Sequence, residues 1–224
     1  MLSLNEFDEA TDGGAQADGP DGANPPLVFN IILRQTFQEC VACGIWFEWQ
    51  GEQENKAKFV VQFESLGSVH ENTYQHGLNG MENAFAYFLG AANDQFKHSI
   101  IVKQAPQYTG LFRADISDIP PDATITKATL YLHINTIEGL ADADNSSVLS
   151  VHECERTWDW DYASWTHYDE GATWTQPGGD FGVFVREIRA KEDIRDRGFS
   201  RASPNVDFDF TPYVLQLQAA RSQT

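Results

Sequence analysis

The feature that most constrains this chain is a series of short runs in which β-branched and aromatic residues alternate with polar ones. The runs are LVFNIILRQTF, VACGIWFEWQ, KAKFVVQFESL, NAFAYFLG, HSIIVKQ, GLFRADI, ATLYLHINTI, SVLSVHEC, GVFVREI and NVDFDFTPYVLQL. Gly, Pro, Asn and Asp lie between them, and no helical period of similar strength intervenes. Short strands at this spacing predict an all-β fold, which we expect to be an antiparallel jelly-roll β-sandwich.

The composition divides the chain into three parts. Residues 1–26 are rich in Gly, Pro, Asp and Ala and have little to bury, so we expect a flexible acidic arm. Residues 27–66 form extra N-terminal strands that could serve as an assembly element, and residues 67–224 form the jelly-roll domain. Within that domain, VREIRAKEDIRDRG (residues 185–198) is either an amphipathic helix or a charged excursion between strands.

The charge of the chain excludes two classes of partner. With 33 acidic and 15 basic residues, the formal net charge is −18, which phosphate backbones and anionic lipids repel. We therefore expect neither nucleic-acid nor membrane binding. Polyuronates and sulfated glycans are disfavoured in the same way unless a local basic patch overrides the global field. Neutral glycans and protein partners stay open.

Known catalytic motifs are absent from the sequence. It contains no HExxH, GxSxG, P-loop or dinucleotide-binding glycine pattern, and a lone CxxC at Cys40 and Cys43 lacks the second pair of a zinc ribbon. A glycosidase needs only two carboxylates, which sequence alone cannot exclude. We predict that the protein is not an enzyme and has no cofactor, and a structural calcium ion is the alternative left open.

Residues 158–174 concentrate aromatic and acidic side chains. Aromatic faces contact the apolar surface of sugar rings, and carboxylates bind hydroxyl groups. This composition predicts a carbohydrate-binding platform made of Trp158, Trp160, Tyr162, Tyr168, Asp159 and Asp161. The alternative is that the tryptophans anchor a long loop. We expect that role for Trp165 and Trp174, and we expect Trp160 and Tyr162 to be exposed.

Two further groups of residues carry hypotheses. The glycines of the Gly178–Gly179–Asp180 turn permit positive φ, and the Asp180 carboxylate either caps backbone N–H groups or binds calcium. In the charged segment that follows, Arg186, Arg189 and Arg195 are candidates for a subunit interface with an acidic partner. The alternative is a solvated face with internal ion pairs.

The order of several landmarks resembles a known family. They are ENTYQHG, IPPDATI followed by ATLYLHI, the Trp-rich WDWDYASWTHYDEGATWTQPGGD, and the closing strand at Phe208, Asp209, Phe210 and Thr211. Over about residues 68–219 this order resembles the disaggregatase-related (DNRLRE) domain family. The resemblance implies a β-sandwich like those of carbohydrate-binding modules.

The sequence leaves two functional interpretations. The chain opens MLSLNEFDEATDGG, which has neither the basic nor the apolar region of a secretory signal, so we expect synthesis in the cytoplasm without a leader. We favour a structural or surface subunit of a large particle such as a bacteriophage virion (head decoration, fibre or adhesin), in which protein subunits are the partners. The alternative is an extracellular carbohydrate-binding module of a polysaccharide-degrading or adhesive system.

Overall fold

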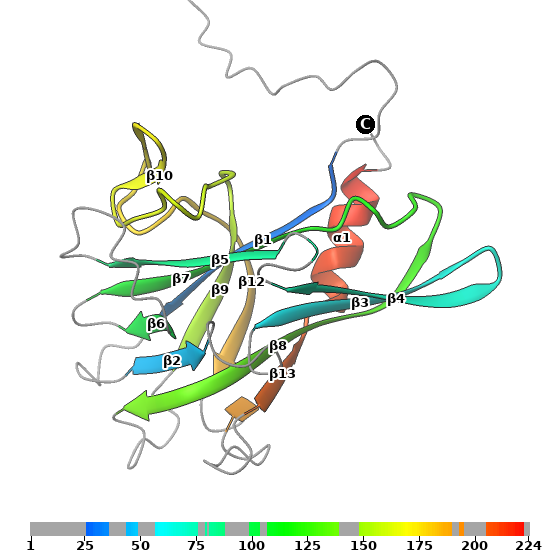
Figure 1. The fold of residues 1–224 in the computed structure, drawn as a ribbon, viewed down its shortest axis with the longest axis horizontal. Coiled ribbons are helices and arrows are strands. Elements are labelled where there is room, and N and C mark those ends of the chain that lie inside the picture. Colours follow the sequence, from blue (N-terminus) through cyan, green and yellow to red (C-terminus); the bar gives the residue numbers. More distant parts are fainter. Residues whose placement is uncertain are drawn as a thin grey trace, which may run out of the picture.

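The part of the protein that the structure describes is built mostly from β-strands, with one α-helix close to the C-terminal end (Figure 1). The computed structural model describes residues 26–35, 44–48, 57–75, 79, 81–87, 99–103, 107–138, 148–189, 193–194 and 205–221. The expected acidic arm up to residue 25, the CxxC cysteines and Arg195 lie outside these residues. Among the described helices, none is long and apolar enough to cross a membrane.

The strands pair antiparallel throughout the described residues. In chain order they are β1 (Val28–Gln35), β2 (Gly44–Glu48), β3 (Lys58–Ser65), β4 (Ser68–Gln75), β5 (Met81–Tyr87), β6 (Ser99–Lys103), β7 (Tyr108–Asp115), β8 (Thr124–Glu138), β9 (Val148–Cys154), β10 (His167–Asp169), β11 (Ala172–Thr173), β12 (Phe181–Arg189) and β13 (Asn205–Asp209), followed by α1 (Thr211–Arg221). Eleven of them are hydrogen-bonded in the order β12-β9-β1-β7-β6-β2-β8-β3-β4, with β13 beside β8 and β5 beside β7.

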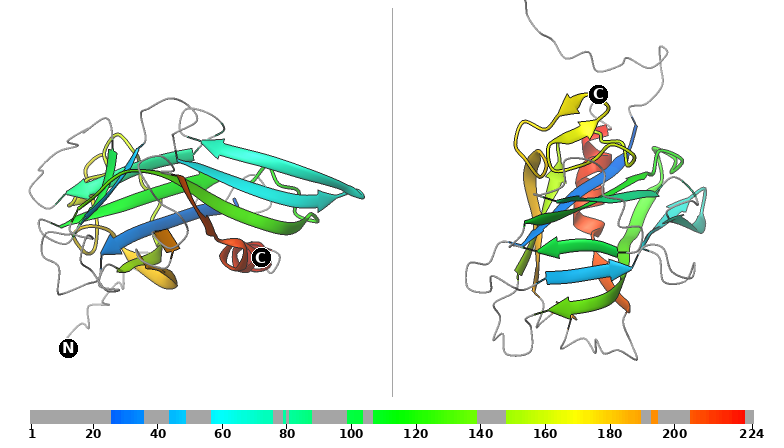
Figure 2. Two further views of the ribbon diagram at one scale, coloured as in Figure 1. Left: turned by 90° about the horizontal axis from the view of Figure 1, so that it is seen from below. Right: turned by 60° about the vertical axis from the view of Figure 1, so that its left-hand side comes forward.

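Strand β8 joins the two layers of the structure. Its first part pairs with β3 and β13, whereas its last residues, from Ile134 to Glu138, pair with β2. The hydrogen-bonded sheet therefore folds over on itself, with β12, β9, β1 and β7 on one side and β13, β8, β3 and β4 on the other (Figure 2). This arrangement confirms the expected antiparallel β-sandwich. The jelly-roll connectivity stays a prediction.

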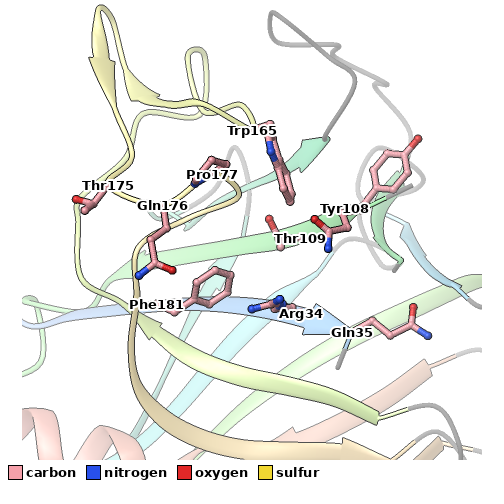
Figure 3. A pocket seen from close by; sticks show the side chains of 10 residues that line it. Arg34, Gln35, Tyr108, Thr109, Trp165, Thr175, Gln176, Pro177 and Phe181 are labelled. Atoms are coloured by element: carbon pink, nitrogen blue, oxygen red, sulfur yellow. The ribbon is translucent and has the colours of Figure 1, made fainter. Parts of the chain in front are cut away.

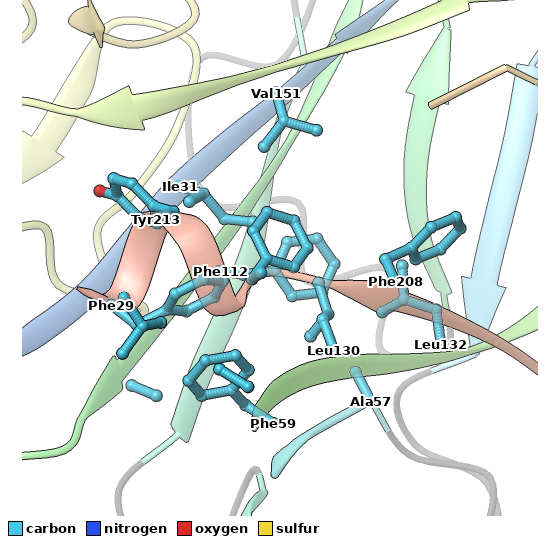
Figure 4. Packing of buried hydrophobic residues seen from close by; sticks show 14 of the residues in the cluster. Phe29, Ile31, Ala57, Phe59, Phe112, Leu130, Leu132, Val151, Phe208 and Tyr213 are labelled. Carbon is cyan, nitrogen blue, oxygen red and sulfur yellow. The ribbon is translucent and has the colours of Figure 1, made fainter. Parts of the chain in front are cut away.

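Apolar side chains from both layers fill the space between them (Figure 4). The ring of Phe29 on β1 stacks on Phe59 of β3 with 4.0 Å between centroids, and Phe210 meets Phe29 edge-on at 5.3 Å. On β3, Phe59, Val61 and Phe63 are buried while the residues between them are not. The alternation in the sequence therefore corresponds to side chains that point alternately into and out of the core.

The end of the fold corrects one strand prediction. We expected NVDFDFTPYVLQL to be a single strand, but β13 ends at Asp209 and α1 begins at Thr211. The Asp209 carboxylate accepts hydrogen bonds from the Thr211 N–H at 2.9 Å and hydroxyl at 2.6 Å, and these bonds hold its pKa below the usual value. Pro212 has no N–H for a strand ladder and is well suited to a first helical turn. The Val214 N–H then donates to the Phe210 carbonyl.

The strands within residues 27–66, which we expected as extra N-terminal strands, pair with strands from later in the chain. Strands β3 and β4 form one hairpin across that boundary, turning at Leu66 and Gly67, which both have positive φ. Strand β1 lies between β7 and β9, which come much later in the chain. The helical alternative for residues 185–198 is also wrong over its first part, because β12 continues to Arg189.

Candidate functional site

The residues from Glu155 to Asp180, here called the covering segment, lie over the outer surface of β1, β7 and β9. They include the small ribbon of β10 and β11 (Figure 1). The covering segment explains why β1 is buried on both faces: Phe29, Ile31 and Leu33 face the main core, whereas Ile32 faces a second one. The second core consists of Ile32, Leu111, Cys154, Trp158, Ala163 and Trp174.

Asn30 fastens the covering segment to β1. Its side-chain oxygen accepts a hydrogen bond from Trp158 Nε1 at 2.9 Å, and its Nδ2 donates to the carbonyls of Cys154 and Arg156, both at 2.9 Å. The Asn30 side chain is 8% exposed, so these bonds satisfy an amide that would otherwise be buried without partners. A polar residue in the middle of an apolar strand thereby fixes the position of the loop above it.

Trp158 and Trp174 anchor the covering segment and do not form a binding surface. Trp158 is 1% exposed; Arg113 donates to its carbonyl at 2.6 Å and lies over its ring at 5.4 Å. Trp174 is 5% exposed and its Nε1 donates to the Ser164 carbonyl at 2.8 Å. The expected anchoring role of Trp174 is confirmed. The Trp158 ring is buried, so it does not present the exposed aromatic face that the predicted glycan platform requires.

The remaining residues of the predicted platform differ in exposure, although Asp159 and Asp161 lie close to Tyr162. Trp160 is half-buried between the two cores, and Tyr168 is half-buried against Trp174 at 5.4 Å. Asp159 closes a turn by accepting the Asp161 N–H at 2.7 Å, so its carboxylate supports the backbone. Tyr162 is 42% exposed, and the nearby charge of Glu170 is the largest cause of its raised pKa. Tyr162 alone keeps the exposure that we expected.

Asp180 caps the end of the covering segment and does not fit a calcium site. It is 4% exposed, accepts the Gln176 N–H at 2.9 Å and pairs with Arg156 Nε at 2.5 Å. Burial acts to raise the pKa of Asp180, but hydrogen bonds from Gln176, Thr175 and Arg156 together hold it below the usual value. A guanidinium already balances this carboxylate, and within the described ranges no three His, Cys, Asp or Glu side chains gather as metal ligands.

Two glycines before Asp180 let side chains lie close to the backbone, Trp165 at Gly178 and Ile32 at Gly179. Gly178 has a φ of 91°, and a Cβ atom on it would lie 2.7 Å from Trp165 Cζ3. Gly179 has a φ of 130°, and a Cβ there would lie 2.6 Å from Ile32 Cδ1. The Gly178 N–H donates to the Trp165 carbonyl at 2.7 Å, and the Thr109 hydroxyl donates to the Gly178 carbonyl at 2.7 Å. The turn is therefore fixed both to β7 and to Trp165.

Beside this turn lies a cavity of about 260 Å³, here called the Trp165 pocket (Figure 3). It is lined by Arg34, Gln35, Gln107, Tyr108, Thr109, Trp165, Thr175, Gln176, Pro177 and Phe181. In Figure 3, Trp165 and Pro177 descend from the covering segment on one side, while Phe181 and Arg34 lie opposite them on the strands. Residues far apart in the chain thus meet where the covering segment ends on the sheet.

The lining combines aromatic faces with neutral polar groups. Three glutamines and two threonines line it beside three aromatic rings, and none of the described lining residues is acidic. Arg34 is its charged residue, and its guanidinium lies 5.3 Å from the centre of the Phe181 ring. Gln35 is 5% exposed, and within the described structure its Oε1 atom is buried without a hydrogen-bond partner. Such a lining suits a ligand with both hydroxyl groups and apolar faces.

A second hollow, beside β4, is acidic and less suited to a ligand. Its carboxylates already have partners: Asp118 accepts hydrogen bonds from the Tyr74 hydroxyl and from Asn72 Nδ2, and Asp115 accepts the Ser117 N–H. Burial, with the bond to Asp118 next in importance, strongly raises the pKa of Tyr74. These contacts hold the edge of the sheet together, so we do not assign a function to this hollow.

Two of the predicted interface arginines have partners within the protein. Arg186 donates to the Asp209 carbonyl at 2.8 Å, lies over the rings of Phe208 and Phe210, and has Asp193 at 3.8 Å. Arg189 pairs with Glu187 at 3.2 Å. These contacts favour the alternative interpretation, a solvated face with internal ion pairs, for Arg186 and Arg189.

The sequence analysis missed Tyr108, Phe181, Trp165 and Arg34 as members of one site. The signal for Trp165 was the glycine pair at 178–179, which admits a large ring close to the backbone.

Comparison of the chain with protein-family models, with curated proteins and with solved structures finds no match. The resemblance to the disaggregatase-related family therefore stays a prediction.

Proposed function

We propose that the protein is a non-catalytic β-sandwich that binds a neutral glycan in the Trp165 pocket. The observation that carries this proposal is the lining itself, in which the Trp165 and Phe181 rings face a set of amide and hydroxyl groups. Aromatic rings remove the apolar faces of a sugar from water, and amide groups exchange hydrogen bonds with its hydroxyls.

The same lining supports binding without hydrolysis. Glycoside hydrolysis ordinarily needs two carboxylates on opposite sides of the scissile bond, one of which donates a proton. The described residues around the Trp165 pocket include no Asp or Glu. Asp180 is adjacent in the chain, but its oxygens are bound by Gln176 and Arg156. The described lining therefore offers a sugar aromatic faces and neutral polar groups but no carboxylate for its hydrolysis.

Affinity electrophoresis in gels containing neutral glucans, mannans or galactans tests the proposal. We expect at least one polymer to slow the protein, and Trp165→Ala to weaken binding by about tenfold or more, since a tenfold change corresponds to about 1.4 kcal/mol. Gln176→Ala is a second variant. It removes the amide of an exposed pocket residue, so it should fold normally and weaken binding. Tyr162→Ala removes an exposed aromatic ring outside the pocket and should bind like wild type. Equal binding by all four proteins would refute the assignment.

A structural role in a large particle, such as a bacteriophage virion, is the second candidate. Exposed apolar side chains favour it: Leu66 and Val69 at the tip of the β3–β4 hairpin are 97% and 73% exposed, and Val183 and Phe184 on the edge strand β12 are 66% and 53% exposed. Such side chains commonly mark protein interfaces. Native mass measurement tests this role, because a particle subunit forms large assemblies and a free binding module does not.

A further inference from the structure

We infer that the Trp165 pocket binds the terminal sugar residue of a glycan and not the interior of its chain. This inference rests on the proposed function and names the part of the ligand that is recognised. It is carried by three properties of the pocket: its size, the fixed wall on the side of the covering segment, and the surplus of hydrogen-bonding groups around it.

The size of the pocket matches one sugar ring. A volume of about 260 Å³ is slightly below the range of about 300–1,000 Å³ that is usual for small-molecule sites. One pyranose ring with some of its hydroxyl groups needs a space of this order. Several linked rings in an extended chain need a longer groove.

The wall made by the covering segment cannot easily open into a groove. Trp165 is held against Gly178 by the close approach of its ring and by the 2.7 Å bond from the Gly178 N–H. The Gly178 carbonyl is bound in turn by the Thr109 hydroxyl on β7. Asp180, two residues beyond, is buried and accepts hydrogen bonds from Arg156 Nε and the Gln176 N–H. A chain that continued past Trp165 on this side would have to displace these contacts.

The polar groups also favour a chain end. An internal sugar residue has lost two hydroxyl groups to glycosidic bonds, whereas a terminal residue keeps one of them. The pocket offers three glutamine amides and the Arg34 guanidinium, which lies over Phe181. An additional free hydroxyl exchanges hydrogen bonds with amide and guanidinium groups of this kind.

The test is a calorimetric titration with oligomers of glucose, mannose and galactose of two to six residues. Two modified series accompany them, one methylated on the 4-hydroxyl of the non-reducing terminal residue and one reduced with borohydride at the other end. We expect affinity to change by less than about threefold from two to six residues, and one of the two modifications to weaken binding by about tenfold or more. Trp165→Ala should weaken binding of every unmodified oligomer, and Tyr162→Ala should weaken none.

The outcomes separate this inference from the proposed function. Affinity that rises steadily with oligomer length, together with equal binding of both modified series, would show that the chain interior is bound. The inference would then be wrong while glycan binding stood. If no oligomer binds and Trp165→Ala behaves as wild type, the inference and the proposed function both fail. A length-independent affinity that is lost in one modified series, and in Trp165→Ala, would support both.

Discussion

Replacement of Gly178 by alanine should disturb the Trp165 pocket more than any other single methyl group added to the covering segment. The new Cβ atom would lie 2.7 Å from Cζ3 and 2.8 Å from Cη2 of Trp165, and these two ring atoms would have to move. Gly178 also has a φ of 91°, which an L-residue adopts only with strain. The substitution therefore combines a backbone penalty with a steric one.

Gly171→Ala is the matched control for this substitution. Gly171 lies in the same segment with a φ of 70°, but no atom approaches its hypothetical Cβ within 4 Å. The backbone penalty for an L-residue at positive φ is roughly 1–2 kcal/mol, and overpacking a well-filled site costs about 1–3 kcal/mol more. We therefore expect Gly171→Ala to lower the free energy of unfolding by about 1–2 kcal/mol and Gly178→Ala to lower it by about 2–5 kcal/mol.

Urea denaturation followed by tryptophan fluorescence gives the two free energies of unfolding, and calorimetry gives the affinity for the glycan that wild type binds best. Gly178→Ala should weaken binding by about tenfold or more because the Trp165 ring moves, and Gly171→Ala should leave affinity unchanged. Equal loss of stability in both variants, with normal binding by Gly178→Ala, would mean that the glycine does not position the ring. The reasoning about the pocket wall would then be refuted.

Three further predictions concern groups beneath and beside the pocket. Asn30→Leu should lower the free energy of unfolding by about 2–4 kcal/mol in urea denaturation, because Trp158 Nε1 and two carbonyls lose their partner. Asp180 has a lowered pKa, so the stability it contributes is complete above the unfolded pKa of about 3.9 and is lost as the pH falls through the folded value. Asp180→Asn should therefore be less stable at pH 7 and should lose less stability than wild type between pH 5 and pH 2, measured by urea titrations at each pH. Burial raises the pKa of Cys154 to about 12, so peptide mapping should find its thiol unmodified by iodoacetamide at pH 8 until urea unfolds the protein.

The strands and their antiparallel arrangement could be predicted from the sequence because alternation is a local property. Phe59, Val61 and Phe63 show it directly, and β3 lies where the pattern indicates. The end of β13 was missed because the alternation of Phe208 and Phe210 continues into apolar residues with helical spacing. The Asp209–Thr211–Pro212 signal of a helix start is as local as the alternation, so it could have been recognised.

The candidate site was only partly predictable, because its residues meet through tertiary contacts. The covering segment has no regular period, so its sequence does not distinguish Trp158, which is buried, from Trp165, which lines the pocket. Arg34 and Tyr108 reach the same pocket from strands that are adjacent in the sheet but distant in the chain. Which side chain a loop buries depends on the surface beneath it, and that surface is set by distant parts of the chain.

Burial of β1 on both faces has a consequence for biosynthesis. The bonds from Asn30 join residues separated by 124 to 128 positions, and the strand pairs with β7 and β9. Strand β1 emerges from the ribosome before any of these partners has been synthesised. Its apolar side chains are therefore exposed to water, and able to aggregate, until those partners are made. Long-range β pairing of this kind is slow and exposes sticky edges. Low temperature and chaperone co-expression should therefore raise the soluble yield more than changes at the surface of the finished molecule.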